Sequence, residues 1–209
     1  MNSKESLISS LITEGYLKTP EIIDAFRTIA REDFVPEELR QEAYGNYPLP
    51  IGEGQTISQP LTVAFLLELL EPRAGNKILD IGAGSGWTTA LLAYIVGEKG
   101  KVFGIERIQK LCELGRKNLA KYFDESRTKI ICGDGTKGLP EKAPFDKILT
   151  GAAASRDIPQ AWREQLKVGG RIVAPVGGSI WLYVKKSETE LEEKEFPGFV
   201  FVPLIKNKQ

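Results

Sequence analysis

Lys77-Ile-Leu-Asp-Ile-Gly-Ala-Gly-Ser-Gly-Trp87 is the stretch of sequence that decides the fold. An apolar strand runs directly into a G-x-G-x-G turn, and Asp80 stands just ahead of that turn. Glycine adopts backbone conformations and close approaches that a Cβ forbids, so the chain can turn sharply beneath a ligand. The pattern predicts a nucleotide-type cofactor loop, with a helix N-terminus directed at it, formed by Gly82, Gly84, Ser85 and Gly86.

The spacing of the glycines narrows the choice of cofactor. Dinucleotide enzymes use G-x-G-x-x-G, whereas the third glycine comes one residue early here. Asp80 also disfavours a pyrophosphate, because a carboxylate beside the loop suits a ligand that carries an ammonium group. S-adenosylmethionine has that ammonium and no phosphate. A nicotinamide-dependent oxidoreductase is the disfavoured alternative.

The composition predicts a single domain that recognises its partners locally. The chain has 209 residues and balances 28 basic against 28 acidic residues, so no global field draws it to nucleic acid or to an anionic membrane. The longest apolar run, 90–96, is too short to span a bilayer, and the polar segment 1–5 has no signal-peptide layout. We therefore expect a cytoplasmic monomer that binds neither membranes nor nucleic acid.

The cysteines and the absent histidines restrict the chemistry. Cys112 and Cys132 lack C-x-x-C spacing, which predicts two small apolar core residues with reduced thiols and no metal site. The chain has no histidine, which excludes Ser-His-Asp catalysis, the Cys-His nucleophile pair and nearly all the usual zinc sites. Any reaction must proceed without an imidazole base.

The alternation of strand-like and helix-like segments after residue 77 predicts the α/β class, with a doubly wound, mostly parallel sheet. Strands are expected at 77–81, 101–105, 128–132, 145–150 and 170–175, and crossover helices at 87–96, 108–122 and 159–167. Two β-prone runs, 180–185 and 199–204, predict an antiparallel pair at the sheet edge, separated by a charged linker.

The chain ahead of this α/β core, which runs from 77 to 209, divides into a helical segment, 1–44, and an irregular segment, 45–60. Thr19-Pro20 is typical of a helix start, and the residues that follow it give that helix one apolar face: Ile22, Ile23, Phe26 and Ile29. Long irregular segments inside compact domains are usually functional, so 45–60 is expected to form a lid or substrate loop.

Three acids follow or end strands, where an open parallel sheet binds its ligand. Asp80 suits the charged end of the cofactor. Glu106, about twenty residues beyond the glycines, suits two ribose hydroxyls, with a solvated strand-end charge as the alternative. Asp134, between two glycines, suits the adenine amino group, with a plain turn as the alternative. Together they match one ligand from tail to base, and the chain here resembles the class I S-adenosylmethionine-dependent methyltransferases.

The segment Tyr47-Pro-Leu-Pro-Ile-Gly-Glu-Gly-Gln-Thr-Ile-Ser-Gln-Pro60 resembles the signature of the protein-L-isoaspartate O-methyltransferases. Further matching motifs follow in the order typical of that family: Gly133-Asp-Gly135, Ala143-Pro-Phe-Asp146, Gly151-Ala-Ala-Ala154, Gly169-Gly-Arg171, Pro175-Val-Gly177 and Phe201-Val-Pro-Leu204. The resemblance implies methylation of the free α-carboxylate of L-isoaspartyl residues in damaged proteins and peptides. Such a carboxylate, with a pKa of about 3.9, is already ionised and needs no general base.

The same resemblance implies roles for individual residues. Ser58 matches the residue that is catalytic or orients the substrate, although it is also placed to cap an apolar helix over 61–70. Gln55, Thr56 and Ile57 match lid contacts to the cofactor, Arg107 and Gly135 accompany the strand-end acids, and Leu49, Pro50 and Ile51 are expected to bind substrate and exclude water.

The chain departs from the family pattern at three places. Asn46 stands where aspartate is usual, Trp87 replaces a common tyrosine, and the glutamine often found after Pro-Val-Gly177 is missing. Two alternatives to the main interpretation stay open. One is a methyltransferase acting on another carboxylate or a small metabolite, and the other is a non-catalytic homologue that only binds S-adenosylmethionine.

Overall fold

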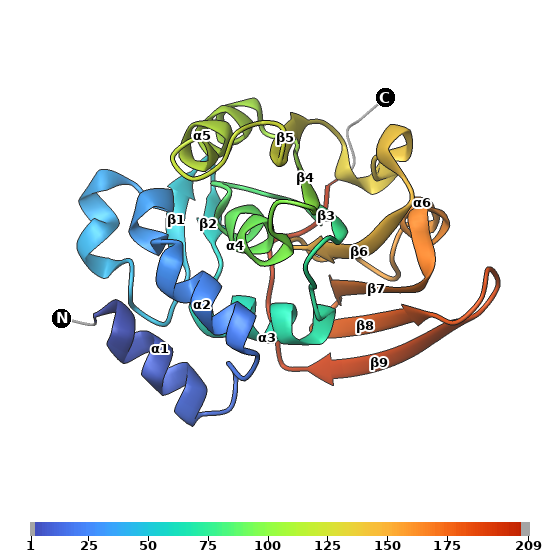
Figure 1. Cartoon of the computed structure of the whole chain (residues 1–209), viewed down its shortest axis with the longest axis horizontal. Helices are drawn as coiled ribbons and strands as arrows, with labels where there is room; N and C mark the ends of the chain where they lie inside the picture. The colour runs from blue at the N-terminus through green and yellow to red at the C-terminus, as the bar shows by residue number, and fades with distance from the viewer. Residues whose placement is uncertain (1–2, 206–209) are drawn as a thin grey trace.

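A seven-stranded sheet forms the centre of the molecule in a computed structural model that describes residues 3–205 (Figure 1). The strand order is β5-β4-β3-β6-β7-β8-β9, parallel from β5 to β7 and antiparallel from β7 to β9. The strands are β3 (Lys77–Ile81), β4 (Lys101–Glu106), β5 (Thr128–Cys132), β6 (Phe145–Thr150), β7 (Leu166–Val176), β8 (Ser179–Lys185) and β9 (Leu191–Pro197). The predicted α/β class with an antiparallel edge is therefore confirmed.

The strand order reverses beside β3, and this reversal positions the site. The chain runs from β3 outward through β4 to β5 and then returns to place β6 on the other side of β3. The crossover connections from β3 and from β6 therefore leave in opposite directions, which opens a crevice at the carboxyl ends of these two strands. The register pairs Asp80 with Gly104 of β4 and with Leu149 of β6, so Asp80 lies at the middle of this switch point.

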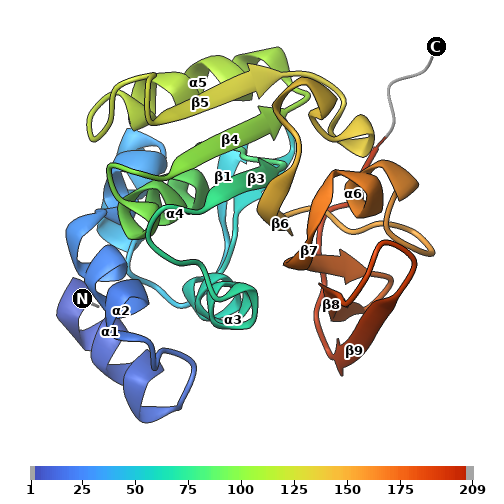
Figure 2. The ribbon, with the colours of Figure 1, turned by 45° about the vertical axis from the view of Figure 1, so that its right-hand side comes forward.

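Helices cover both faces of the sheet because successive strand residues point to opposite sides. Ile78 belongs to a large apolar cluster with the helices of one face, whereas Leu79 and Ile81 belong to a second cluster on the other face. The first face carries α3 (Pro60–Leu70), α4 (Trp87–Val96) and α5 (Gln109–Leu119); the second carries α6 (Gln160–Gln165) and the short 3-10 helices η3 (Gly135–Lys137) and η4 (Pro140–Lys142) (Figure 2).

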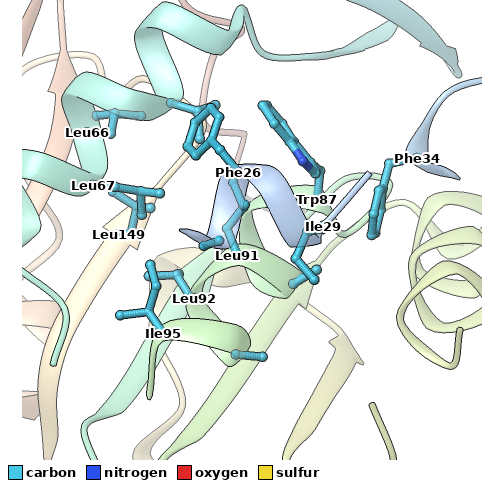
Figure 3. Close-up of a cluster of buried hydrophobic side chains, with 14 of the residues drawn as sticks. Phe26, Ile29, Phe34, Leu66, Leu67, Trp87, Leu91, Leu92, Ile95 and Leu149 are labelled. Atoms are coloured by element: carbon cyan, nitrogen blue, oxygen red, sulfur yellow. The ribbon is translucent and has the colours of Figure 1, made fainter. Parts of the chain in front are cut away.

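The N-terminal segment forms an extra layer beyond α3 and α4. It comprises α1 (Lys4–Thr13), α2 (Pro20–Thr28), and the 3-10 helices η1 (Arg31–Phe34) and η2 (Glu37–Glu42). Thr19 is the N-cap of α2 as predicted, although its hydroxyl donates to Glu68 of α3 at 2.7 Å. Phe26 and Ile29 are buried and point among side chains of α3 and α4 (Figure 3). Residues 1 and 2 of the polar start and the last four residues of the expected core lie outside the described residues.

Cys112 of α5 and Cys132 of β5 form a disulfide bond, so the expectation of two reduced core thiols is wrong. The helix α5 packs back on the strand that follows it, which brings cysteines 20 residues apart to a Cα–Cα distance of 5.7 Å. That distance is ordinary for a disulfide. Disulfides persist in oxidising compartments and also in intracellular proteins of hyperthermophiles, so the cysteines give no support for a cytoplasmic location.

The antiparallel edge pairs different segments from those predicted. The charged segment expected as a linker forms most of β9, which pairs with β8 from Ser179↔Pro197 to Lys185↔Leu191. An edge strand tolerates such charges because its side chains reach solvent. The apolar run 199–204 is instead extended chain without a regular strand, and it returns to the switch point beside Ala153.

The expected irregular segment contains a small hairpin of β1 (Leu49–Gly52) and β2 (Gln55–Ile57). Its tip holds Glu53 in a left-handed conformation, with a φ of 52°, between two glycines that also have positive φ. The segment is therefore more ordered than its proline and glycine content predicted. No helix within residues 3–205 is both long and apolar enough to cross a bilayer.

Candidate active site

A pocket opens at the switch point, between the carboxyl ends of β3, β4 and β6 and the β1-β2 hairpin. Most of the residues predicted for the site line it: Ile51, Gln55, Thr56, Ile57, Ser58, Asp80, Gly82, Gly84, Ser85, Glu106, Arg107 and Gly135. Four predicted residues are not among its lining residues. Leu49 is buried in the apolar core, Pro50 is exposed, and Gly86 and Asp134 are next to lining residues in the chain.

The glycine loop brings the lid close to the cofactor strand. Gly84 has a φ of 55°, and a Cβ added to it would lie 3.2 Å from Cδ1 of Ile51 on the hairpin. Gly86 has a φ of 94°, and its Cβ would lie 3.2 Å from the carbonyl oxygen of Gly115 in α5. Positive φ and these contacts favour glycine at both positions. The glycine loop therefore packs against the hairpin at Gly84 and against α5 at Gly86.

Asp80 is a buried carboxyl group at the centre of the site. It is 2% exposed, and the hydroxyl of Thr89 in α4 donates a hydrogen bond of 2.6 Å to its Oδ2. Burial raises the pKa of Asp80 to about 6; the nearby charge of Glu106 adds to this, and the Thr89 hydrogen bond opposes it. A cationic group bound beside Asp80 would restore its ionised form.

On the hypothesis that the ammonium group of S-adenosylmethionine binds the ionised form of Asp80, the affinity for this ligand should rise about tenfold between about pH 5 and pH 7. Calorimetric titration across this range measures the change, and Asp80→Asn removes it. A wild-type affinity that is flat across this range contradicts the assignment.

In the ligand-free protein, the pH dependence of folding stability has the opposite sign to that of ligand binding. Between about pH 4 and pH 6 the folded chain keeps a proton on Asp80 that the unfolded chain has lost, because the folded pKa is the higher. The contribution of Asp80 to the free energy of unfolding therefore falls as the pH rises through this window and levels off above it.

Glu106 is held at the end of β4 by two backbone groups. Its Oε2 accepts the N–H of Gly84 at 3.0 Å, and its Oε1 accepts the N–H of Ile108 at 2.9 Å. The side chain is 6% exposed and lines the pocket. Each carboxylate oxygen has two lone pairs, so a second hydrogen bond to each oxygen is compatible with this arrangement. The solvated-charge alternative for Glu106 is therefore wrong.

Asp134 shapes the turn after β5. Its Oδ1 accepts hydrogen bonds from the backbone N–H of Thr136 at 2.9 Å and from the Thr136 hydroxyl at 2.7 Å, which caps η3. The next residue, Gly135, is buried, lines the pocket, and accepts a hydrogen bond of 2.8 Å from Nε1 of Trp162 in α6. The turn reading of this motif is thus correct for its local structure, and it places Gly135 against the pocket.

Ser58 lines the pocket just after β2 and does not cap α3. The N-cap of α3 is Gln59, which makes no side-chain capping bond. The backbone N–H of Leu61 instead donates to Oδ1 of Asn46 at 3.0 Å, and Nε2 of Gln59 donates to the carbonyl oxygen of Asn46 at 2.9 Å. The uncharged Asn46 therefore supplies the cap that the alternative interpretation gave to Ser58.

Several lining residues were missed by the sequence analysis. They come from α4, from the end of β6 and from the C-terminal segment: Thr88, Leu149, Gly151, Ala152 and residues 202–205. The N–H of Ala153 donates to the carbonyl of Val202 at 2.8 Å, and the N–H of Leu204 donates to the carbonyl of Ala153 at 2.7 Å. The position of Gly151 directly after a predicted strand was a usable signal, since this edge of the sheet binds the ligand.

The chemistry of the lining fits S-adenosylmethionine. Among the described residues, the charged groups at the pocket are Asp80, Glu106 and Arg107. This set offers two carboxylates to an ammonium group and ribose hydroxyls, whereas a pyrophosphate calls for several basic or backbone N–H donors. Aliphatic side chains such as Ile51, Ile105 and Leu111 complete the walls. Fold and site together define a class I S-adenosylmethionine-dependent methyltransferase.

Comparison with known proteins gives the family. Residues 2–209 match the family model described as protein-L-isoaspartate (D-aspartate) O-methyltransferase. The chain is 44% identical over 207 residues to the protein-L-isoaspartate O-methyltransferase of Methanopyrus kandleri, covering 97% of this chain and 91% of that one. It is 45% identical over 210 residues to the enzyme of the same name from Ignicoccus hospitalis, covering 98% of both. The chain belongs to the protein-L-isoaspartate O-methyltransferase family.

Solved structures show the same architecture. A protein-L-isoaspartate O-methyltransferase structure superposes with a TM-score of 0.86 at 29% identity, covering 96% of this chain and 65% of that chain. A Plasmodium falciparum protein assigned to the same activity, solved with S-adenosyl-L-homocysteine, superposes with a TM-score of 0.87 at 24% identity, covering 99% of this chain and 100% of that one. These likenesses confirm the fold, and the family is one that uses S-adenosylmethionine.

Proposed function

We propose that this protein transfers the methyl group of S-adenosylmethionine to the free α-carboxylate of L-isoaspartyl residues in damaged proteins and peptides. The observation that carries the proposal is the pocket itself. It places Asp80 and Glu106 at adjacent strand ends beneath a hairpin that leads directly into Ser58, in a chain that matches the family over nearly its whole length.

The cofactor lies along the strand ends in this proposal. Asp80 and the glycine loop hold the methionine end, Glu106 accepts hydrogen bonds from the ribose hydroxyls, and Gly135, which lines the pocket beside the turn capped by Asp134, contacts the adenine. Arg107 and the lid residues, Gln55 to Ile57, border the same cavity. When bound, S-adenosylmethionine supplies a methyl group attached to a positively charged sulfur. The carbon of this methyl group is the atom that an anionic oxygen attacks, and the sulfur leaves as a neutral thioether.

The acceptor needs alignment and dehydration and does not need a base. An isoaspartyl α-carboxylate is ionised at neutral pH, which suits a site without histidine. We assign to the Ser58 hydroxyl the role of donating a hydrogen bond to one carboxylate oxygen, so that the other oxygen faces the methyl group in a near-attack geometry.

The hairpin supplies the water-excluding cover in this proposal. Ile51 and Ile57 are each 5% exposed and line the pocket. These two side chains therefore exclude water, a role that was expected of Leu49, Pro50 and Ile51. The strand β1 alternates buried and exposed residues, and Pro50 is one of the exposed ones. Excluding water favours methyl transfer, because the carboxylate and sulfonium charges both disappear as the methyl group moves. Water would stabilise the charged reactants more than the transition state.

Transfer of labelled methyl from S-adenosylmethionine to an isoaspartyl peptide tests the proposed function. We expect base-labile label on the peptide that is released as methanol, as a methyl ester requires. Small carboxylates and amino acids at the same concentration serve as the comparison. Stable label on a small molecule would favour a different methyltransferase, and calorimetric binding of S-adenosylmethionine without any transfer would favour the non-catalytic homologue.

A further inference from the structure

Arg31 is a fully buried cation without an acidic partner. It is 1% exposed, and no carboxylate within residues 3–205 lies within ion-pair distance of it. Burial lowers the pKa of Arg31 to about 10, so it stays protonated at neutral pH. A buried charge is costly unless hydrogen bonds compensate for it. The cost of burying this charge therefore suggests a role for Arg31 beyond filling the core.

The guanidinium donates to backbone carbonyls at both ends of the lid hairpin. Nη2 of Arg31 lies 3.1 Å from the carbonyl oxygen of Tyr47, two residues before β1, and 3.1 Å from that of Ser58, the residue directly after β2. Nη1 donates to the carbonyl of Ala43 at 2.6 Å. One rigid, planar group thus joins the two stems of the hairpin to the helical segment ahead of it.

The same guanidinium also contacts the residue that follows the glycine loop. Its Cζ lies 5.2 Å from the ring centroid of Trp87, the first residue of α4, which lines the pocket and packs edge-to-face on Phe26 (Figure 3). A cation over an indole ring is attracted by the electrons of the ring. The guanidinium of Arg31 therefore donates hydrogen bonds to the hairpin along its edge and stacks its face near Trp87 in the wall of the pocket.

We propose that Arg31 is a positioning residue for methyl transfer: it fixes the base of the β1-β2 hairpin and the backbone of Ser58 relative to the cofactor loop. The proposal rests on the proposed function. Ser58 has a carbonyl held by Arg31 and a side chain on the pocket wall, so the direction of its hydroxyl depends on this clamp. A displacement of about 1 Å in an aligned site costs up to about 100-fold in rate.

Arg31→Lys and Arg31→Met test the clamp. Lysine keeps the charge but lacks the planar fork, so it is not expected to rescue activity. We expect kcat on an isoaspartyl peptide to fall by about 10- to 100-fold in both variants, with the dissociation constant for S-adenosylmethionine, measured by calorimetry, changing by less than about threefold. Amide hydrogen exchange should accelerate at 49–57 and stay unchanged in β3 and β4.

Leu11→Ala is the matched control. Leu11 is fully buried in α1 and does not line the pocket, so its truncation lowers the melting temperature without touching the hairpin. It should keep kcat when assayed well below its melting temperature. Equal kcat in Arg31→Lys and Leu11→Ala, or unchanged exchange at 49–57 in both Arg31 variants, overturns the proposal.

The clamp and the proposed function fail in distinguishable ways. Wild-type protein that leaves the isoaspartyl peptide unmethylated contradicts the function, while the exchange of 49–57 in the variants still tests the clamp. If both Arg31 variants fail to fold, amide hydrogen exchange of the hairpin in the ligand-free wild type tests the clamp instead. Amides of Ile51 and Ile57 that are protected as strongly as those of β3 support a hairpin held at its base, and exchange at the rate of an open loop overturns it.

Discussion

Replacing Ser58 with alanine should lower kcat for methylation of an isoaspartyl peptide by about 100-fold, the usual cost of one lost oriented donor. The affinity for S-adenosylmethionine should stay within about threefold, because Asp80 and Glu106 keep their contacts. Stability should change little, since α3 is capped through Asn46 and not through Ser58. Steady-state kinetics, calorimetry and thermal unfolding of the same preparation measure the three quantities.

The contrast between activity and stability is the test of Ser58. Asn46→Ala is the matched variant, because it removes the observed cap of α3 and should lower the free energy of unfolding by about 1 kcal/mol. A Ser58→Ala protein that unfolds like Asn46→Ala and keeps wild-type kcat would assign Ser58 a structural role only.

Glu106→Ala should weaken S-adenosylmethionine binding by at least about 100-fold. The two hydrogen bonds that we propose from ribose hydroxyls to this carboxylate, each worth about 1.5–3 kcal/mol, would be lost together. The backbone N–H groups of Gly84 and Ile108 lose their acceptor as well, which loosens the loop under the ligand. Calorimetric titration below the melting temperature of the variant gives the dissociation constant.

Two further variants separate the site from general charge effects. Glu106→Gln keeps one acceptor oxygen and should bind with intermediate affinity. Glu98→Gln removes a negative charge from an exposed position between α4 and β4 and should bind like the wild type. A Glu106→Ala protein with wild-type affinity would show that the ribose is held elsewhere.

The sequence predicted the part of the fold that rests on apolar runs and glycine spacing. The run before Gly82 and its counterparts at β4, β5 and β6 form the parallel sheet, because strands buried on both faces must be continuously apolar. The strand β9 was missed because its stability comes from pairing with β8, and its glutamates face solvent at an edge. The disulfide was missed because spacing does not show that α5 packs back on β5.

The lining of the pocket was predictable where an acid or a hydroxyl stands at a position that the sequence marks. Asp80, Glu106 and Ser58 were found because strand ends and the family signature place acids and a hydroxyl at one edge. Pro50 does not line the pocket, because the strand alternation inside a hairpin that the sequence did not predict leaves it exposed. Arg31 was missed because its partners are backbone carbonyls, which leave no residue-type pattern.

The most direct test of the account compares one peptide in two forms, with an L-isoaspartyl residue or with a normal L-aspartyl residue at the same position. The two forms share composition and charge and differ in the placement of the free carboxylate along the backbone. We predict that kcat/KM for methylation is at least about 1,000-fold higher for the isoaspartyl form, because only its α-carboxylate is presented to the methyl group in alignment. Equal values for the two forms, or methylation of the aspartyl form alone, would contradict the account.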